Sequence, residues 1–270
     1  MNETVVLITG AASGIGRALA AKLGARGARL VLADLDEAGL HAIASAIAVG
    51  GGHAEVHRLD VTDAAAFEAL IAATAARHGR LDAIYNNAGI AMVAEARDMS
   101  AADFERVVRV NLLGVVYGSL AAYRVMLAQG GGHIVNVASL AGLLGSPTFS
   151  AYAASKAGVV AFTRDLATEA QAFGIRVTAV CPGFIESSIY EHSELRGLPR
   201  EQVRKLVPLP LVPTDRAADI ILEGVAAGRA LLVFPFYARL LWWLARHVPW
   251  LLRPLRARAV AEFRKVRQAP

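Results

Sequence analysis

Short apolar runs alternate along the chain with longer stretches rich in alanine and leucine. The runs have the length of β-strands, and the stretches between them have the length of helices. Apolar runs without alternating polar positions are typical of strands buried on both faces of a parallel sheet. We therefore predict a single-domain, Rossmann-like, doubly wound α/β fold of about seven parallel strands, with helices on both faces and an appended C-terminal helical tail. The clearest runs are Val5–Thr9, Arg29–Ala33, Ala54–Leu59, Ala83–Tyr85, His133–Ala138 and Ile175–Val180.

Residues that favour helix ends lie where the pattern changes. Helix starts are indicated by Asp36, Thr62 and Ser100, whose side chains can accept hydrogen bonds from free backbone N–H groups. Helix ends are indicated by glycine, which adopts the left-handed conformation of a C-terminal cap at little cost. These glycines are Gly27, Gly79 and Gly174.

The composition is that of a globular chain with a large core, since 55% of the 270 residues are hydrophobic and 19% are charged. The single cysteine, Cys181, cannot form an internal disulfide, and we expect it to be a small buried residue in the reducing cytoplasm. Cysteines and histidines lack the spacing of a zinc site, so we expect no metal. Residues 1–10 lack the pattern of a signal peptide, and glycines and a proline interrupt the longest uncharged run, so we expect no membrane-crossing helix.

Basic charge is concentrated in a C-terminal tail, residues 235–270, which we separate from a sheet domain formed by residues 1–234. The tail holds seven Arg and one Lys against one Glu, a net charge of +7, whereas the whole chain carries +5. Tryptophans and leucines between the arginines predict a helix at a membrane surface, with breaks at Pro249 and Pro254. Packing of the tail on its own subunit, or on the active-site mouth of a neighbouring subunit, is the alternative. The aliphatic side chains argue against a nucleic-acid-binding strip.

A glycine-rich turn, TGAASGIG at residues 9–16, follows the first predicted strand and leads into a helix. Glycine lets the backbone approach a pyrophosphate, and the helix N-terminus offers free N–H donors and a positive dipole end. Asp34 ends the second predicted strand, where a carboxylate can bond ribose hydroxyls and repel a 2′-phosphate. These features predict NAD as the cofactor, with NADP as the alternative. A plain tight turn and a helix-capping Asp34 would use the same residue types.

Further motifs follow in order, and with them the chain resembles the short-chain dehydrogenase/reductase family over about residues 4–230. Besides the glycine turn, they are Asp60-Val61, Asn86-Asn87-Ala88-Gly89, Asn111, Ser139, YAASK from Tyr152 to Lys156, and Cys181-Pro182-Gly183. The resemblance implies that Asp60 and Val61 contact adenine and that Asn87, Ala88 and Gly89 form the floor of the cofactor site. The cofactor-binding residues it implies are Gly10, Ser13, Gly14, Ile15, Gly16, Asp34, Asp60, Val61, Asn87, Ala88, Gly89, Tyr152, Lys156, Pro182, Gly183, Ile185 and Ser187.

Tyr152 and Lys156 are four residues apart on a predicted helix and therefore share a face. A nearby ammonium favours phenolate, so we predict that Lys156 lowers the pKa of Tyr152 from about 10 toward neutral pH, where proton transfer is most effective. An exposed Tyr–Lys pair would show the same spacing. Ser139, at the carboxyl end of a predicted strand, favours the catalytic interpretation because ligands of such sheets bind there.

The resemblance gives each of these residues a role in interconverting a secondary alcohol and a ketone. It implies that Tyr152 is the acid/base, that Ser139 bonds the reacting oxygen, that Lys156 also holds the nicotinamide ribose, and that Asn111 positions a water for proton relay. A non-catalytic NAD-binding sensor or scaffold on the same fold is the alternative from another class. The implied contacts to the nicotinamide ring and its carboxamide come from Pro182, Gly183 and Ser187.

Residues 184–213 form a segment longer than an ordinary connector, and in the family this region covers the substrate as a lid. Large apolar residues also lie near the predicted strand ends, at Leu143, Leu144, Phe149 and Phe184. They predict a bulky hydrophobic substrate, steroid-, retinoid- or lipid-like, although the same side chains would suit the core. We expect a homodimer or homotetramer. The apolar residues and prolines of the lid are Ile189, Tyr190, Leu195, Leu198, Val203, Leu206, Pro208, Pro210 and Pro213.

Overall fold

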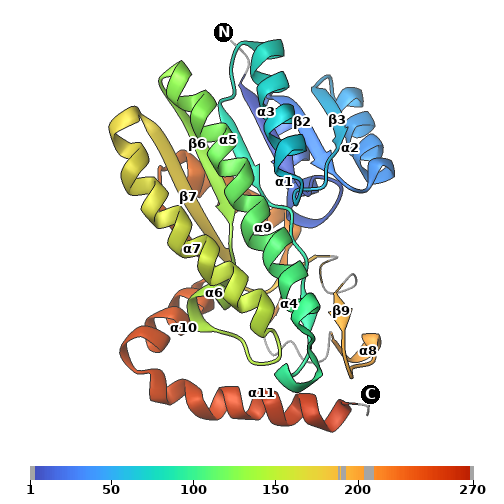
Figure 1. Ribbon diagram of the computed structural model, residues 1–270, viewed down its shortest axis with the longest axis vertical. Coiled ribbons are helices and arrows are strands. Elements are labelled where there is room, and N and C mark those ends of the chain that lie inside the picture. Colours follow the sequence, from blue (N-terminus) through green and yellow to red (C-terminus); the bar gives the residue numbers. More distant parts are fainter. Residues whose placement is uncertain (1–3, 188, 190–192, 204–209, 268–270) are drawn as a thin grey trace.

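A seven-stranded parallel sheet forms the centre of the computed structural model, which describes residues 4–187, 189, 193–203 and 210–267 (Figure 1). The strand order β11-β7-β6-β4-β1-β2-β3 reverses direction beside β1, so the sheet is doubly wound, as predicted. Every predicted strand is present, with ends that differ by at most two residues. The strands are β1 Val5–Thr9, β2 Arg29–Asp34, β3 His53–Arg58, β4 Ala83–Asn86, β6 Gly132–Val137, β7 Ile175–Pro182 and β11 Leu231–Phe234.

Helices cover both faces of the sheet, and this explains why a central strand such as β1 is apolar along its whole length, whereas the edge strand β3 carries polar residues. Successive residues of β1 point to opposite faces: Ile8 packs under α1, α2 and α9, and Leu7 packs under α3, α5 and α7. Both side chains are fully buried. These helices are α1 Gly14–Ala25, α2 Glu37–Val49, α9 Thr214–Ala226, α3 Ala64–His78, α5 Gly114–Gln129 and α7 Ser150–Ala170.

Two of the three predicted helix starts are confirmed. The Asp36 carboxylate accepts a hydrogen bond from the Gly39 N–H at 3.0 Å, and Ser100 forms a capping box with Asp103. The prediction for Thr62 is wrong: α3 begins two residues later, and the carboxylate of Asp63 caps it. The Thr62 hydroxyl instead donates to Asp60 at 2.8 Å. The predicted glycine ends are confirmed by left-handed φ angles at Gly27, Gly79 and Gly174.

A helical stretch of residues 101–129 runs beside the sheet and contains a π-helical turn. It consists of α4 (Ala101–Val108), the π-turn Arg109–Leu113 and α5. By length and apolarity alone, this is the one helix of the described residues that could span a membrane. In the fold α5 packs against α3 and against β4 and β6. The π-turn holds Asn111, and such turns are frequent at functional sites.

Short elements gather at the carboxyl edge of the sheet, between the strands and the tail. Strand β5 (Met92–Val93) pairs with β9 (Glu194–Leu195), and β8 (Ile185–Glu186) pairs with β10 (Val212–Pro213). The other short elements there are η1 Ala96–Asp98, α6 Leu140–Leu144 and α8 Arg200–Val203, whereas η3 Gln171–Phe173 lies just before the start of β7.

The tail is helical, as predicted, and lies against the carboxyl edge of the same chain (Figure 1). It comprises α10 (Phe236–His247), the 3-10 turn η5 (Pro249–Leu252) and α11 (Arg253–Val266). The predicted break at Pro249 is confirmed, but the one at Pro254 is wrong. Pro254 lies in the first turn of α11, where its missing N–H would have no partner within the helix. Helix α10 packs against α6, and α11 runs from there toward β9 and α8.

Candidate active site

The glycine turn joins β1 to α1 and tolerates no side chain at two of its positions. A Cβ on Gly16 would lie 2.0 Å from the Gly10 carbonyl oxygen, and a Cβ on Gly10 would lie 2.8 Å from the Cα of Ala88. Gly10 and Gly14 also adopt left-handed φ angles of 66° and 52°. Ser13 is the N-terminal cap position of α1, and Ile15 lies in its first turn. The backbone can therefore approach a ligand at a helix N-terminus.

Hydrogen bonds from the end of β4 fix the shape of this turn. The Asn87 side-chain amide donates to the carbonyl oxygens of Thr9 and Gly10, both at 3.1 Å. The Thr9 hydroxyl accepts from the backbone N–H groups of Asn87 and Ala88, also at 3.1 Å. The structure thus brings together the predicted floor residues and the glycine turn. Sequence reasoning missed Thr9, although a hydroxyl residue at a strand end before glycine is a usable signal.

Asp34 ends β2 and faces the glycine turn. Its carboxylate accepts hydrogen bonds from the backbone N–H groups of Ala12 at 3.0 Å and Asp36 at 3.2 Å. The alternative that Asp34 caps α2 is wrong, because the Asp36 side chain occupies that cap. Arg58 lies opposite Asp34 in β3, but its guanidinium lies 3.5 Å from the Glu37 carboxylate.

Asp60 and Val61 follow β3, on the same side as Asp34. The Asp60 carboxylate accepts from the N–H and the hydroxyl of Thr62 at 2.9 and 2.8 Å. Val61 is buried and packs against Gly114, where a Cβ would lie 2.8 Å from its Cγ2. These contacts place the pair beside the start of α5.

Ser139, Tyr152 and Lys156 lie together at the carboxyl end of β6. Ser139 caps α6, where its hydroxyl accepts from the Ala141 N–H at 3.1 Å, and its side chain also forms a hydrogen bond with the Tyr152 phenol. The Lys156 ammonium lies 5.9 Å from the centre of the Tyr152 ring. It is buried and donates to the carbonyl oxygen of Val137 at 2.7 Å. Helix α7 thus presents both predicted residues to the strand end that carries Ser139.

Burial governs the ionisation of this group. It raises the pKa of the Tyr152 phenol, and the hydrogen bond with Ser139 only partly opposes that effect. Burial also lowers the pKa of the Lys156 ammonium to about 8. The prediction of a lowered phenol pKa is therefore wrong for the chain by itself. Desolvation penalises both charged forms, and the ammonium is engaged by a carbonyl rather than by the phenol oxygen.

Asn111 lies in the π-turn and is fully buried. Its side-chain oxygen accepts from the Ile90 N–H at 2.8 Å, and its amide donates to the Ile90 carbonyl at 2.9 Å and to the Ser155 hydroxyl at 3.2 Å. A Cβ on Gly89 would lie 3.0 Å from the Asn111 oxygen and 3.5 Å from the Lys156 ammonium. Asn111 therefore ties the segment after β4 to the helix that carries Tyr152.

Cys181 is fully buried in β7, and burial raises its pKa to about 12. The thiol is therefore neutral, as expected of a small core residue rather than a nucleophile. In the part of the chain that the structure describes, no group of His, Cys, Asp and Glu residues is arranged to hold a metal ion.

The loop after β7 is held by a residue of the tail. The Gly183 N–H donates to the Phe234 carbonyl at 2.7 Å, and the Phe184 N–H donates to the Tyr237 hydroxyl at 2.8 Å. A Cβ on Gly183 would lie 2.7 Å from that hydroxyl oxygen. Sequence reasoning missed Tyr237, because no motif marks it and the contact spans 53 residues. The other predicted contacts of this loop are Pro182 in β7, Ile185 buried in β8, and Ser187, whose Cβ lies 3.4 Å from a Cβ built on Gly14.

The apolar residues predicted to face the substrate are covered in part by the tail. Leu143 and Leu144 pack in a cluster with Leu241 and Trp242 of α10, and the Phe184 ring stacks on Tyr237 with centres 6.5 Å apart. Of the predicted lid, Leu195 and Leu198 pack with Phe149 and with Phe263 of α11. Pro210 and Pro213 are among the described residues. Tyr190, Leu206 and Pro208 lie outside the described residues, as does the side chain of Val203.

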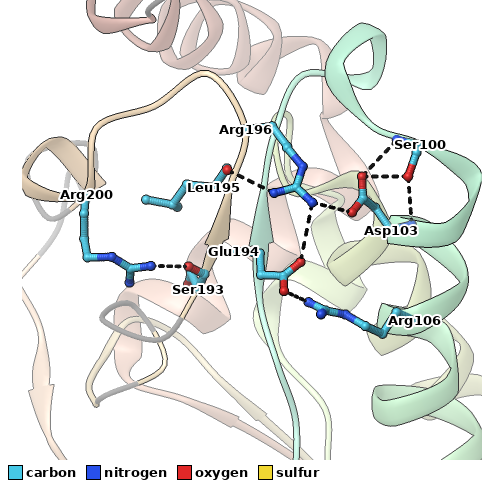
Figure 2. Close-up of polar contacts among 8 residues, drawn as sticks. All are labelled: Ser100, Asp103, Arg106, Ser193, Glu194, Leu195, Arg196 and Arg200. Atoms are coloured by element: carbon cyan, nitrogen blue, oxygen red, sulfur yellow. Dashed lines mark hydrogen bonds and ion pairs between the residues drawn. The ribbon is translucent and has the colours of Figure 1, made fainter. Parts of the chain in front are cut away.

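Ion pairs connect the described part of the lid to α4 (Figure 2). Arg196 lies 2.8 Å from the Asp103 carboxylate, and Glu194 pairs with Arg106. The Arg200 guanidinium donates to the carbonyl oxygen of Ser193 within the lid itself.

Comparison with known proteins identifies relatives of the whole arrangement. A family model described as short chain dehydrogenase matches residues 4–196. Levodione reductase of Leifsonia aquatica is 43% identical over 206 residues, which are 75% of this chain and 77% of that protein. A Mycobacterium tuberculosis protein named "Probable oxidoreductase EphD" is 37% identical over 262 residues, 93% of this chain. The chain spans 44% of the length of that relative.

A solved structure resembles the fold over almost its full length. It is a short chain dehydrogenase/reductase from Burkholderia phymatum in complex with NAD, with a TM-score of 0.85 and 30% sequence identity. The match covers 93% of this chain and 96% of that one.

Proposed function

The chain belongs to the short-chain dehydrogenase family, and we propose that it is an NAD(H)-dependent oxidoreductase that interconverts a secondary alcohol and a ketone. One observation carries the proposal. Ser139, Tyr152 and Lys156, from two separate segments, meet at the carboxyl end of β6. In doubly wound sheets this edge is where ligands bind.

The residues around the glycine turn fit a dinucleotide. Gly10 and Gly16 leave the space that a Cβ would fill, and the N-terminus of α1 offers N–H groups to a pyrophosphate. We assign the ribose hydroxyls of adenosine to Asp34, which favours NAD because a 2′-phosphate would meet its negative charge. Arg58 is the nearest cation in the neighbouring strand, and it pairs with Glu37. A bound nicotinamide would supply the hydride in ketone reduction and accept it in alcohol oxidation.

Tyr152 moves the proton in this proposal. In reduction its hydroxyl donates the proton to the substrate oxygen, and the Ser139 hydroxyl donates a hydrogen bond to the same oxygen. Burial raises the pKa of Tyr152, which keeps the phenol protonated for this step. In oxidation the proton returns from the substrate hydroxyl to the phenolate, which the nearby Lys156 ammonium stabilises. We also assign Lys156 to the nicotinamide ribose, and Asn111 to a relay water beside its bonds to Ile90.

We propose a bulky hydrophobic substrate. The lid supports this, because its residues Leu195 and Leu198 pack in one apolar cluster with Val93 and Phe149. Val93 and Phe149 adjoin residues that pack with Tyr152. Such a wall offers apolar contact area and few polar groups, so it binds aliphatic surface better than sugar hydroxyls.

The test incubates purified protein with NAD and, in separate reactions, 2-propanol, 2-octanol or a hydroxysteroid. The absorbance of reduced nicotinamide measures the rate. The proposal expects turnover with NAD and a higher kcat/KM for 2-octanol than for 2-propanol. Faster turnover with NADP would favour the NADP-linked ketone reductase. Tight NAD binding without turnover of any of these alcohols, or of the matching ketones with reduced NAD, would favour the sensor or scaffold.

We retain residues 1–234 and 235–270 as catalytic domain and tail, and we place the enzyme in the cytoplasm at an anionic membrane surface. An exposed apolar face on the tail supports this attachment. A groove of about 540 Å³ there is lined by apolar side chains with Arg229, Arg239 and Arg246, and none of the described residues that line it is acidic. Sedimentation with anionic vesicles tests it. The face would instead be a subunit contact if the protein does not bind the vesicles and if replacing Trp243 dissociates the dimer or tetramer. The exposed apolar residues are Phe236, Leu240, Trp243, Trp250, Leu251 and Leu255.

A further inference from the structure

We propose that helix α11 is a strap that fixes the substrate-binding wall of its own subunit, with Phe263 and Arg264 as its positioning residues. The inference rests on the proposed function for its substrate. It assigns the C-terminal half of the tail a role in substrate affinity that is separate from the attachment surface, whose residues lie on α10, on η5 and, with Leu255, at the start of α11. In Figure 1, α11 passes across the carboxyl edge of the sheet from α10 to the neighbourhood of β9 and α8.

Phe263 is the apolar anchor of the strap. It is 1% exposed, although it belongs to a helix whose other apolar side chains are largely exposed or half-buried. Its cluster joins three segments that are distant in sequence: Val93 from β5, Phe149 from the start of α7, and Leu195 and Leu198 from the lid. A fully buried aromatic ring that touches three segments restrains each of them relative to the others.

Ion pairs beside Phe263 also hold α11 in place. Arg264 pairs with Glu95 at 2.7 Å, and Arg267 donates to Asp98 at 2.6 and 2.9 Å. The side chain of Glu95 is 9% exposed and also pairs with Arg97. These arginines hold the pKa of Glu95 and of Asp98 below the usual carboxyl range. Glu95 lies two residues after β5 and Asp98 lies in the following turn η1, so β5 and the segment after it are held by apolar and by ionic contacts.

The segment from Met92 to Glu95 connects the strap to the acid/base residue. Its residues alternate between two faces, as extended backbone requires. Met92 and Ala94 pack in a cluster with Tyr152, whereas Val93 packs with Phe263 and Glu95 pairs with Arg264. A displacement of this segment toward α11 would therefore change the surface beside the Tyr152 ring.

The connection before α7 is held by the same segment. The Ala94 N–H donates to the carbonyl oxygen of Thr148 at 2.8 Å, and Ala94 forms a parallel bridge with Phe149. Thr148 has a φ of 67°, which a β-branched residue adopts only when its surroundings enforce it. On the other side of the wall, the pairs of Asp103 with Arg196 and of Arg106 with Glu194 hold the lid to α4 (Figure 2). The wall is thus restrained by α4 and by α11 together.

The test compares Phe263→Ala, Phe263→Leu and Arg264→Gln with Leu255→Ala, a matched control whose side chain is 49% exposed on the same helix. For 2-octanol we expect KM to rise about tenfold in Phe263→Ala and Arg264→Gln, because a displaced wall loses apolar contacts with the alkyl chain that the bound substrate and the transition state share. The change in kcat, in KM for 2-propanol and in NAD affinity should stay within about twofold. Phe263→Leu should restore most of the affinity, and the control should match the wild type.

Trypsin gives a second readout that needs no turnover. Arg196 and Arg200 lie in the lid, and mass spectrometry can follow cleavage after them. Loss of the strap should accelerate this cleavage about tenfold relative to the control. If the wild type is active and the folded Phe263 and Arg264 variants have an unchanged KM for 2-octanol, the proposed role of α11 is overturned. If the wild type turns over no alcohol or ketone, the proposed function fails, and the cleavage rate alone decides: equal rates in variants and control overturn the strap.

Discussion

The tail residue Tyr237 offers a sharp prediction, because it contacts the loop assigned to the nicotinamide. Its hydroxyl accepts the Phe184 N–H at 2.8 Å and fills the space beside Gly183. Tyr237→Phe removes only this oxygen and retains the ring that stacks on Phe184. The variant therefore separates the hydrogen bond from the packing.

The structure sets the size of the expected effect. A partly buried N–H that loses its acceptor costs about 1–3 kcal/mol, unless the loop moves to let water replace the oxygen. In the variant, the conformation with the loop in place is destabilised by that free energy relative to a displaced loop. Converted to a population, it corresponds to a kcat/KM lowered by about 5- to 150-fold.

The assay measures kcat/KM for NAD with 2-octanol as the second substrate, together with NAD affinity by calorimetry. Tyr123→Phe is the control. It makes the same change on a ring of α5 that lies edge-on to Phe173. Equal kcat/KM values in the Tyr237 and Tyr123 variants would refute the reasoning. So would a loss of thermal stability in Tyr237→Phe with unchanged kinetics, since the oxygen would then serve the fold alone.

Three further predictions follow from single groups. Lys156→Ala should lower both turnover and NAD affinity, because one ammonium serves the phenol and the ribose; an effect on turnover alone contradicts that double role. Asp34→Asn should reduce the preference for NAD over NADP by about tenfold or more, measured as the ratio of kcat/KM values, and an unchanged ratio would remove Asp34 from the ribose site. Burial lowers the pKa of His133 to about 4, so the unfolded chain binds the extra proton first and stability falls as the pH drops from about 6.5 to 4. Urea unfolding should show a loss of up to about 3 kcal/mol over this range, which His133→Gln abolishes; equal losses in both proteins would exclude His133 as the cause.

The sheet was predictable because its strands obey local rules. In β1 every residue is buried, with Leu7 facing one helical layer and Ile8 the other, so the run is apolar throughout. Helix starts were less predictable. Thr62 and Asp63 are adjacent cap residues, and only the three-dimensional contact of Thr62 with Asp60 shows which one caps α3.

The residues of the glycine turn and the catalytic motifs were predictable from spacing and chemistry, but their electrostatics were not. The spacing of Tyr152 and Lys156 shows that they share a helix face. It does not show that both are desolvated, nor that the Val137 carbonyl engages the ammonium. A pKa depends on surroundings contributed by other segments, which a four-residue motif does not contain.

The tail was the least predictable part. Its arginines and tryptophans have the composition of an interfacial helix, yet Arg264 and Arg267 pair with acidic residues 169 residues away in the sequence. Phe263 is buried among side chains of three other segments. Contacts of such sequence separation leave no periodic signal, so composition alone could not distinguish the half that packs on the wall from the exposed half.

The most direct test of the proposed reaction follows the hydride itself. Protein is incubated with NAD and 2-octanol carrying deuterium at the carbinol carbon, and the reduced nicotinamide is analysed by mass spectrometry and NMR. We predict one deuterium at C4 of the nicotinamide ring with the wild type, and a rate about 10² to 10⁴ times lower with Tyr152→Phe, because that variant loses the proton carrier. Reduced nicotinamide without deuterium, or equal rates for the two proteins, would contradict direct hydride transfer with Tyr152 as the acid/base.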